Sequence, residues 1–589
     1  MNTNKALYDV PQVKNFKELI ENSVKLYGAE PAFKLRNADA TYTDITYTAF
    51  KNDIYALGAA ITERGWLGKQ VAIMGLNSYP WITTYLAVQI GGGCVVPIDK
   101  ELYFDDINTI LEVSETDIFF LDKKAYGKIS EHMDKLSRDI TFVVFDAKSG
   151  EDGYIIYDEM LAHGKALFEA KAKCLDEFSA IDADPSVMSV LSFTSGTSGL
   201  TKGVMLSQGN ICFAVISNCS VAKCGPGDQY LSVCPCHHTM EMTEGILIPL
   251  YTGCCIAFND SLLHLMRNLQ EVKPTIFVCV PLMMEKFHGK IMQAVSEKKG
   301  GKLKLTFGKL IADATNAVGV NMNDRIFEEI TKNFGGRLRL FVVGGAAVPP
   351  QPVKDFKTFG IDSYIGYGMT ECAPLIACNH DALFTTDSVG KPIPGVDVKI
   401  INEDSNGIGE ICVKGPNVML GYYKDEALTK ETIDEYGYLH TGDLGSMDSE
   451  GILRIHGRIK NVIVTKNGKN IYPEEIEYHL NNNPLIAESM VVGLDNPEEY
   501  DTVVEAKIFP DFDAIKKKYT EKGKEVPTGK DLEKVFDEII KEINKKLPNY
   551  KNVKKVTLRD NEFIKTTTMK IKRYANIDNG EKDTNEENN

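Results

Sequence analysis

The sequence TSGTSGLTKG at residues 194–203 is the strongest local signal of the fold, because it directly follows the apolar, β-rich run VMSVLSF at residues 187–193. Glycines allow backbone N–H groups to turn toward an anion, hydroxyls add donors, and Lys202 adds a positive charge. The residues expected around a phosphate chain are Thr194, Ser195, Gly196, Thr197, Ser198, Gly199, Thr201 and Lys202. We therefore predict a triphosphate-binding loop at the end of a strand.

The spacing separates this loop from the Walker type, in which the lysine directly follows a glycine and precedes Ser or Thr. Here Lys202 comes three residues after Gly199 and is followed by Gly203. A flexible Ser/Gly linker is the alternative interpretation. It is disfavoured because a linker would not follow an apolar strand so directly.

Helical and strand-like patterns alternate around this loop. Apolar residues recur at helical spacing over residues 16–27 and 50–61. Short β-rich runs occupy residues 70–74, 94–98, 118–121, 141–145 and 338–343. Alternation of this kind predicts an α/β fold with buried, largely parallel strands. Ligand sites in such folds lie beyond the carboxyl ends of the strands.

The pattern changes near Arg458, where shorter strands precede an amphipathic helix over residues 532–547. We predict a large N-terminal α/β domain over residues 1–457 and a small α+β domain over residues 458–575. The polar tail at residues 576–589 is predicted to be disordered.

The net charge of −16 excludes a typical nucleic-acid binder. Residues 511–575 nevertheless hold 18 lysines and arginines against 11 acids. A basic module beside an acidic body indicates a polyanionic ligand, and a lysine-rich solvated surface is the alternative.

The apolar runs are too short to span a bilayer, and the first residues lack the apolar core of a signal peptide. Thirteen cysteines without framework spacing suit a reducing compartment. These observations predict a cytoplasmic protein with at most peripheral contact to the inner face of a membrane.

The stretch FTSGTSGLTKGVMLS at residues 193–207 resembles the signature of the adenylate-forming (AMP-binding) superfamily, which includes acyl-CoA synthetases, luciferase and adenylation domains. Further segments resemble the same superfamily in the expected order, from about residue 16 to residue 573. Two later segments, GRIKNVIVTKNGKNIYPEEIE and KTTTMKIKR, are most similar to those of the long-chain fatty acyl-CoA synthetase branch. The resemblance implies a large AMP-binding domain and a small mobile lid.

The run CPCHHTME at residues 234–241 resembles the superfamily's segment between the nucleotide and acyl pockets, which implies that His238 lines the pocket. A Cys-x-Cys-His-His run also allows a metal interpretation. Structural zinc sites usually need a second ligand pair at a distance, and the sequence offers no evident one.

Two glycine-containing segments resemble the adenine and metal sites. The GGAA segment implies that Gly345, Ala346 and Ala347 lie along the adenine, where small residues allow close approach. The GYGMTE segment implies that Tyr367 stacks on adenine, that Thr370 reaches the α-phosphate and that Glu371, with Thr197, holds Mg²⁺. Gly366, Gly368 and Met369 complete this nucleotide-binding segment.

The last motifs complete the resemblance. Asp443 in YLHTGD is implied to bind the ribose, Arg458 to contact the nucleotide, and Lys460 to act as a hinge that brings Gly468 and Lys469 to the active site. Lys570 takes the place of the catalytic lysine. Two residues depart from the usual pattern, since Ile564 stands for a proline and Met569 for a glycine.

The resemblance implies an AMP-forming acid–thiol ligase that uses ATP and Mg²⁺. By this resemblance the acid is a medium- to long-chain fatty acid. It is first joined to AMP, with Lys570, Thr370 and His238 as catalytic residues, and is then transferred to CoA. An acyl-AMP ligase that loads a carrier protein and an aryl-CoA ligase are the alternatives. A regulator that binds ATP without turnover is disfavoured, because both halves of the site are present.

Overall fold

The computed structural model describes residues 5–148, 153–195, 201–297, 305–312, 326–465, 469–496, 501–566 and 570–577. The chain divides into two compact units. The large unit comprises Met1–Val398 and Val413–Leu439, and the small unit comprises Lys399–Cys412 and His440–Asn589. The boundary between functional domains at residue 458 stays a prediction. The predicted tail starts two residues too early, because Asn576 and Ile577 end the helix α20, Arg573–Ile577, and Asn576 is buried and bonded to Ile564 and Lys572. Residues 578–589 of the predicted tail lie outside the described residues.

The first sheet of the large unit has eight strands in the order β19-β9-β8-β4-β3-β5-β6-β7. Its central strands are parallel, and their bounds are β3 Gln70–Met74, β4 Cys94–Ile98, β5 Ile118–Leu121 and β6 Thr141–Val144. These bounds confirm the predicted strands, which read as continuous apolar runs because both faces of the sheet are covered. The edge strands are β7 Ile155–Ile156 and β19 Gly421–Tyr422.

The described residues on either side of the predicted phosphate loop belong to two paired strands of this sheet. β8 runs over Met188–Ser195 and pairs antiparallel with β9, Thr201–Ser207. Ser195 lies opposite Thr201 in the register, so Thr194 and Ser195 extend the strand that the apolar pattern ended at residue 193. Residues 196–200 lie outside the described residues.

The second sheet has nine strands in the order β16-β15-β14-β13-β12-β10-β11-β1-β2. Its parallel strands are β1 Pro31–Arg36, β11 Cys255–Phe258, β10 Gln229–Ser232, β12 Ile276–Cys279, β13 Leu340–Val343 and β14 Asp362–Gly368. Antiparallel strands close the two edges: β2 Tyr42–Thr46, β15 Leu375–Cys378 and β16 Lys391–Pro392. β13 ends immediately before Gly344, as the predicted run over residues 338–343 requires.

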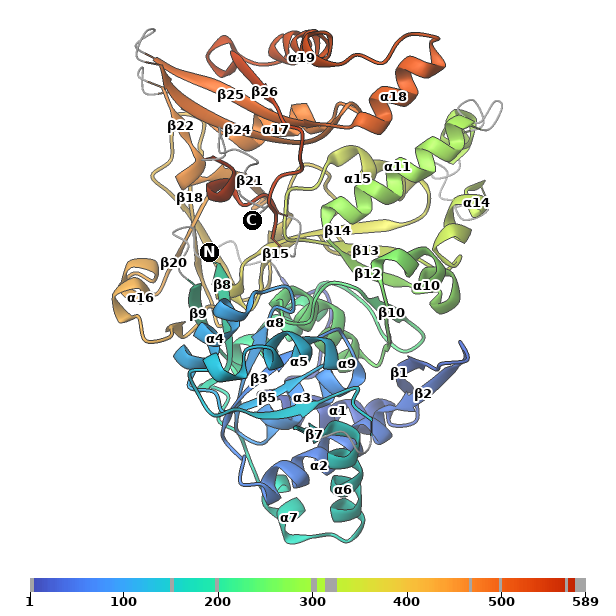
Figure 1. Ribbon diagram of the computed structural model, residues 1–589, viewed down its shortest axis with the longest axis vertical. Coiled ribbons are helices and arrows are strands. Elements are labelled where there is room, and N and C mark those ends of the chain that lie inside the picture. The colour runs from blue at the N-terminus through green and yellow to red at the C-terminus, as the bar shows by residue number, and fades with distance from the viewer. Residues whose placement is uncertain are drawn as a thin grey trace. The chain divides into compact units, whose positions relative to one another are not determined.

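Helices cover these sheets (Figure 1). The predicted helices are α1 Phe16–Tyr27, which buries Phe16 and Leu19, and α2 Tyr47–Glu63, which buries Phe50 and Ile54. Further helices of the large unit, among the residues that the structure describes, include α3 Tyr79–Ile90, α4 Phe104–Val113, α5 Lys123–Ser130, α6 Tyr157–Glu169, α7 Lys173–Ser179, α8 Gln208–Cys219, α9 Ile248–Thr252, α10 Leu265–Val272, α11 Pro281–Glu297, α14 Glu328–Thr331, α15 Pro350–Thr358 and α16 Glu426–Thr432. Both tryptophans lie in this unit: Trp81 on α3 is buried and stacks on Tyr85 at 5.5 Å, and Trp66 lies edge-on to Phe120.

The small unit contains most of a four-stranded sheet, β17 Asp397–Ile401, β18 Gly409–Lys414, β20 Leu439–Met447 and β21 Leu453–Arg458. Its second part has a three-stranded sheet of β24 Ile486–Asn496, β25 Asp501–Pro510 and β26 Lys555–Leu558, beside a short pair of β22 Ile463–Val464 and β23 Asn470–Ile471. The helices are α17 Pro473–Asn481, α18 Phe512–Glu521, α19 Gly529–Asn544 and α20 Arg573–Ile577.

The predicted amphipathic helix is α19, whose buried stripe is Phe536, Ile540 and Ile543. These side chains join a core that the small unit builds from its own residues, including Ile476, Val491 and Ile508. Among the helices that the structure describes, none combines the length and the apolar character needed to cross a bilayer. All thirteen cysteines are free thiols.

Candidate active site

The predicted ribose-binding segment occupies β20 of the small unit. Asp443 lies opposite Arg458 of β21, and its Oδ1 is 2.8 Å from the guanidinium Nε. The carboxylate side chain is 8% exposed and the guanidinium side chain 47%, so the acid is buried and the guanidinium stands at the surface. Gly442 has φ +67°, a left-handed conformation that favours glycine.

Lys570 belongs to the same unit. Its backbone N–H donates to Thr566 Oγ1 at 3.1 Å, and its carbonyl accepts from the Thr566 N–H at 2.8 Å. The side chain is exposed as a whole, but desolvation of the ammonium and the positive charge of Arg458 lower the pKa of Lys570, while Asp443 opposes them. The structure therefore brings Asp443, Arg458 and Lys570 into one electrostatic group.

Both departures in the C-terminal motif, Ile564 and Met569, precede this lysine. The half-exposed Ile564 donates its N–H to Asn576 Oδ1 at 3.1 Å. Arg573 is fixed by Glu477 at 2.5 Å and by the Val491 carbonyl at 2.9 Å. Met569 lies outside the described residues.

The predicted metal and α-phosphate segment follows β14 in the large unit. Gly366, Tyr367 and Gly368 form the end of β14, and Thr370 and Glu371 form a 3₁₀ turn, Thr370–Cys372. The Met369 N–H donates to the Pro374 carbonyl at 2.9 Å. A Cβ on Gly368 would lie 1.9 Å from that same carbonyl oxygen, so this position has no room for a side chain.

Tyr422 links this segment to the phosphate hairpin, and the sequence patterns did not indicate it. Its hydroxyl donates to Glu371 Oε1 at 2.9 Å, and the Lys202 ammonium lies 5.3 Å from the centre of its ring. Burial and the Glu371 charge raise the pKa of Tyr422, so the phenol keeps its proton and remains a donor. Tyr422 reaches this position because β19 pairs with β9, which places it opposite Val204.

The predicted adenine segment begins at Gly344, directly after β13. A Cβ on Gly344 would lie 3.2 Å from Met240 Sδ and 3.4 Å from the Gly366 carbonyl oxygen. The GGAA, GYGMTE and CPCHHTME segments therefore meet at this glycine. Gly345 has φ +89° and, like Ala346 and Ala347, is exposed.

The predicted His segment packs beside this point. The rings of His237 and His238 are 4.1 Å apart, and His237 Nε2 is 3.6 Å from Asp99 Oδ2. Burial, followed by the charges of His238 and Lys100, lowers the pKa of His237. Cys234 and Cys236 are buried, and Asn77 bonds to the backbone of both.

Glu241, at the end of this segment, is fully buried in a π-helix, Glu241–Leu247. Its Oε1 accepts from the Ser232 hydroxyl at 2.5 Å. Burial raises the pKa of Glu241 to about 8, although hydrogen bonds from Ser232, Val233 and Cys234 oppose the rise. The sequence did not predict an uncharged glutamic acid beside the His-containing segment.

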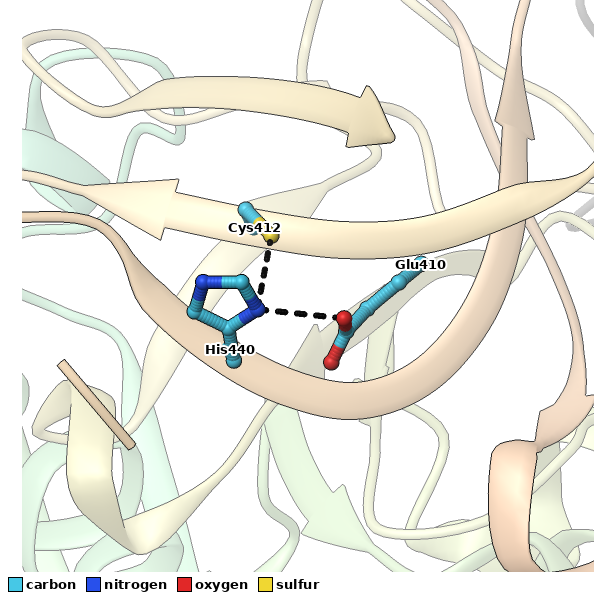
Figure 2. Close-up of side chains that lie close together, drawn as sticks. All are labelled: Glu410, Cys412 and His440. Carbon is cyan, nitrogen blue, oxygen red and sulfur yellow. Dashed lines mark hydrogen bonds and ion pairs between the residues drawn. The ribbon is translucent and has the colours of Figure 1, made fainter. Parts of the chain in front are cut away.

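The described residues contain one group of His, Cys and Glu donors that converge: Glu410, Cys412 and His440 of the small unit, with donor atoms within 4.8 Å of one another. Figure 2 shows the Cys412 sulfur and a Glu410 carboxylate oxygen on the same nitrogen of His440. This group, and not the Cys234–His238 run, is where metal-type donors gather in the described part of the chain.

For the other predicted residues, the structure gives the element or a single contact, or does not describe them. Lys460 lies in a 3₁₀ turn, Ile459–Asn461, and Lys469 packs over the Tyr550 ring at 4.6 Å. Thr201 and Lys202 open β9. The predicted residues Gly196, Thr197, Ser198, Gly199 and Gly468 lie outside the described residues.

Comparison with known proteins places the chain among related sequences and folds. Long-chain-fatty-acid–CoA ligase 1 of Cavia porcellus is 27% identical to this chain and aligns with 96% of it and 85% of its own length. The anthranilate CoA ligase AuaEII, solved in complex with anthranoyl-AMP, superposes with a TM-score of 0.73 at 19% identity, over 96% of this chain and 97% of that one.

The o-succinylbenzoate CoA synthetase MenE of Bacillus subtilis, solved with ATP and a magnesium ion, has a TM-score of 0.70 at 20% identity, over 94% and 98% of the two chains. At such identities these structures establish a shared fold. The model of the AMP-binding enzyme family matches residues 20–423, more than half of the sequence. Together with the fold and the nucleotide motifs, this match shows that the chain belongs to the AMP-binding enzyme family.

Proposed function

We propose that the protein is an AMP-forming acid–thiol ligase, which activates a medium- to long-chain fatty acid as its acyl-adenylate and transfers the acyl group to CoA. The observation that carries the proposal is the group formed by Asp443, Arg458 and Lys570. It offers an acceptor for ribose hydroxyls and two cations for the anions that meet during adenylation.

In the first step, the substrate carboxylate attacks the α-phosphorus of ATP and pyrophosphate leaves. Two anions must approach each other, and a lysine between them lowers that repulsion and stabilises the charge of the transition state. Lys570 suits this role, because it lies at the surface beside the proposed ribose anchor. Thr370 would contact the α-phosphate, and His238 would contact the acyl carboxylate.

The residues fit a magnesium ion in the large unit. Glu371 provides a partly accessible carboxylate whose Oε1 is fixed by Tyr422 at 2.9 Å, and Mg²⁺ prefers such oxygens. The ion, when bound, would neutralise charge on the departing pyrophosphate. Lys202 offers a second cation over the Tyr422 ring, and Thr197 is the further proposed ligand.

In the second step, the CoA thiol attacks the acyl carbonyl and AMP leaves. We propose that the chain from Lys460 onward reorients about that residue, withdrawing Lys570 and presenting Gly468 and Lys469. The surplus of basic residues between positions 511 and 575 supports a dock for the phosphates of CoA.

The relative named a long-chain-fatty-acid–CoA ligase supports the fatty acid as substrate, because it aligns with nearly the whole chain. The fold shared with an anthranilate CoA ligase keeps an aryl acid as an alternative, and a carrier-loading acyl-AMP ligase would share the first step. The thirteen free thiols support a cytoplasmic location, with membrane contact limited to the surface.

The test is to measure AMP and acyl-CoA formation from ATP, Mg²⁺ and CoA across straight-chain acids of increasing length. We expect acid-dependent AMP with a matching amount of thioester and an optimum at medium or long chains. Adenylate without thioester would favour the carrier-loading alternative, and an optimum with aryl acids would favour the aryl-CoA ligase. No turnover with any acid would overturn the proposed function.

A further inference from the structure

The segment that carries Asp443 is bonded along its length to the neighbouring strand β18. Glu410 of β18 bonds on both sides of Thr441: its Oε1 accepts from the Gly442 N–H at 3.2 Å, and its Oε2 lies 3.1 Å from His440 Nδ1. One carboxylate thus bonds to two of the residues that precede Asp443, and Figure 2 shows its bond to His440.

Two further bonds complete this connection. The Thr441 hydroxyl donates to the Ile411 carbonyl at 2.8 Å, and the same oxygen accepts from the Asp443 N–H at 3.0 Å. Every residue from His440 to Asp443 is therefore tied to β18 directly or through one hydroxyl. The Asp443 carboxylate is then directed at Arg458.

Gly442 is the point at which this segment needs support. Its backbone is left-handed, and because glycine has no Cβ it reaches many other conformations at little cost. The bond from its N–H to Glu410 removes that freedom in the residue directly before Asp443. The side chains of Glu410 and His440 are only 16% and 29% exposed, so water and salt screen their pairing less than at an open surface.

We propose that Glu410 is a positioning residue, which fixes Gly442 and His440 so that Asp443 presents its carboxylate to the ribose hydroxyls of ATP. This rests on the proposed role of Asp443 in the nucleotide site. Glu410 itself touches neither ATP nor the acid. Its loss affects the nucleotide and leaves the acid pocket unchanged.

The competing role for the same residues is a cation site. Glutamate, cysteine and histidine are a donor set that Zn²⁺ accepts, and Cys412 Sγ lies 3.6 Å from His440 Nδ1. The separation of 3.1 Å between His440 Nδ1 and Glu410 Oε2 is, however, a hydrogen-bond length, and Glu410 Oε1 already accepts from Gly442. A cation would have to compete with both bonds.

The experiment compares Glu410→Ala, Glu410→Gln and His440→Gln with the wild-type full chain. The matched control is Glu450→Gln, because Glu450 is an exposed acid on the turn of the same β20–β21 hairpin. AMP affinity is measured by calorimetry. Steady-state constants for ATP, for 2′-deoxy-ATP and for the acid are measured by AMP release, and thermal unfolding verifies that each variant folds.

We expect Glu410→Ala to weaken AMP binding and to raise the KM for ATP about tenfold, the cost of one hydrogen bond to a charged group, with the KM for the acid within about twofold of wild type. Discrimination between ATP and 2′-deoxy-ATP should shrink by a similar factor. Glu410→Gln should lie between, because its amide oxygen can still accept from Gly442. Glu450→Gln should match wild type.

Equal losses for ATP and 2′-deoxy-ATP, or unchanged AMP affinity in Glu410→Ala, would overturn the proposal. If Glu410→Ala does not fold, Glu410→Gln and His440→Gln decide by the same ribose discrimination. Stoichiometric Co²⁺ binding with a thiolate absorption band that Cys412→Ser abolishes would also overturn it, in favour of a cation site. AMP affinity is measured without an acid, so its result stands even if wild type turns over no acid and the proposed function fails.

Discussion

The Tyr422 hydroxyl donates a hydrogen bond to the Glu371 carboxylate at 2.9 Å, although the two residues are 51 positions apart in the chain. The same ring lies beneath Lys202, so one aromatic side chain orders the proposed metal ligand and a phosphate-loop cation together. Ligating carboxylates usually depend on such outer partners for their orientation.

Tyr422→Phe should therefore weaken the use of magnesium. The ring remains for Lys202 but Glu371 loses its donor, and we expect the Mg²⁺ concentration for half-maximal AMP formation to rise about tenfold. Mg²⁺ titrations of the adenylation rate measure this, with Tyr423→Phe as the neighbouring control. An identical Mg²⁺ dependence in Tyr422→Phe and wild type would contradict the role.

Lys570→Ala should separate the two half-reactions. Removing a cation that stabilises the transition state costs about 100-fold or more in rate, and we expect that loss in the formation of acyl-adenylate from ATP. Thioester formation from supplied acyl-adenylate and CoA should stay near the wild-type rate. Lys541→Ala, on the exposed face of α19, is the control. Equal loss in both steps would argue against a lysine that serves adenylation alone.

The pH profile of adenylation should depend on Arg458. Desolvation and the Arg458 charge lower the pKa of Lys570, and adenylation needs the protonated ammonium, so the rate should fall as the pH rises through that lowered pKa. Arg458→Gln removes the like charge, and the alkaline limb of the kcat profile should therefore move to higher pH. A limb that stayed in place, or moved to lower pH, would rule out this coupling.

Glu241 should make the protein less stable as the pH rises. The folded state keeps its proton up to a pKa of about 8, whereas an unfolded glutamate releases it near 4.5, so folding stability falls between these values. Glu241→Gln should remove this part of the slope, worth about 1.4 kcal/mol for each pH unit crossed. Unfolding midpoints between pH 5 and 8.5 measure it, with Glu426→Gln as an exposed control. Parallel curves for Glu241→Gln and wild type would refute the assignment.

Gly368 should not tolerate a side chain. Its Cβ would lie 1.9 Å from the Pro374 carbonyl oxygen, so Gly368→Ala must shift backbone in the GYGMTE segment, at roughly 2–4 kcal/mol of stability. Gly127→Ala is the opposite control, because that helical glycine has open space around it and alanine is the better helix former. Thermal unfolding should show a lower midpoint for the first variant and an unchanged or higher one for the second. Equal midpoints would contradict the steric argument.

Much of the framework follows from the sequence, because buried parallel strands are continuous apolar runs. This is why β3 and β5 match their predicted bounds. The pattern fails at Thr194 and Ser195, where polar residues continue a strand because β9 pairs with them. A hydropathy pattern follows side-chain burial and does not register such backbone pairing.

The residues of the candidate site also fall into two groups, those that the sequence predicted and those that only the structure shows. Asp443 and Arg458 were found because each stands in a short, distinctive motif, and the structure pairs them. Tyr422 acts through a bond to a residue 51 positions away, and Glu410 acts through bonds to residues 30 and 32 positions away. These bonds depend on the register of β19 against β9 and on the sheet that holds β18 and β20. No local pattern encodes such a distance, so these residues become visible only in the folded chain.

Because Trp66 and Trp81 are the chain's two tryptophans and both lie in the large unit, intrinsic fluorescence is a selective reporter. Denaturation followed at the tryptophan emission band registers the large unit alone, while the separate core of the small unit melts without changing a tryptophan environment. A mismatch between fluorescence and circular dichroism transitions would then measure how independently the small unit unfolds, without any label.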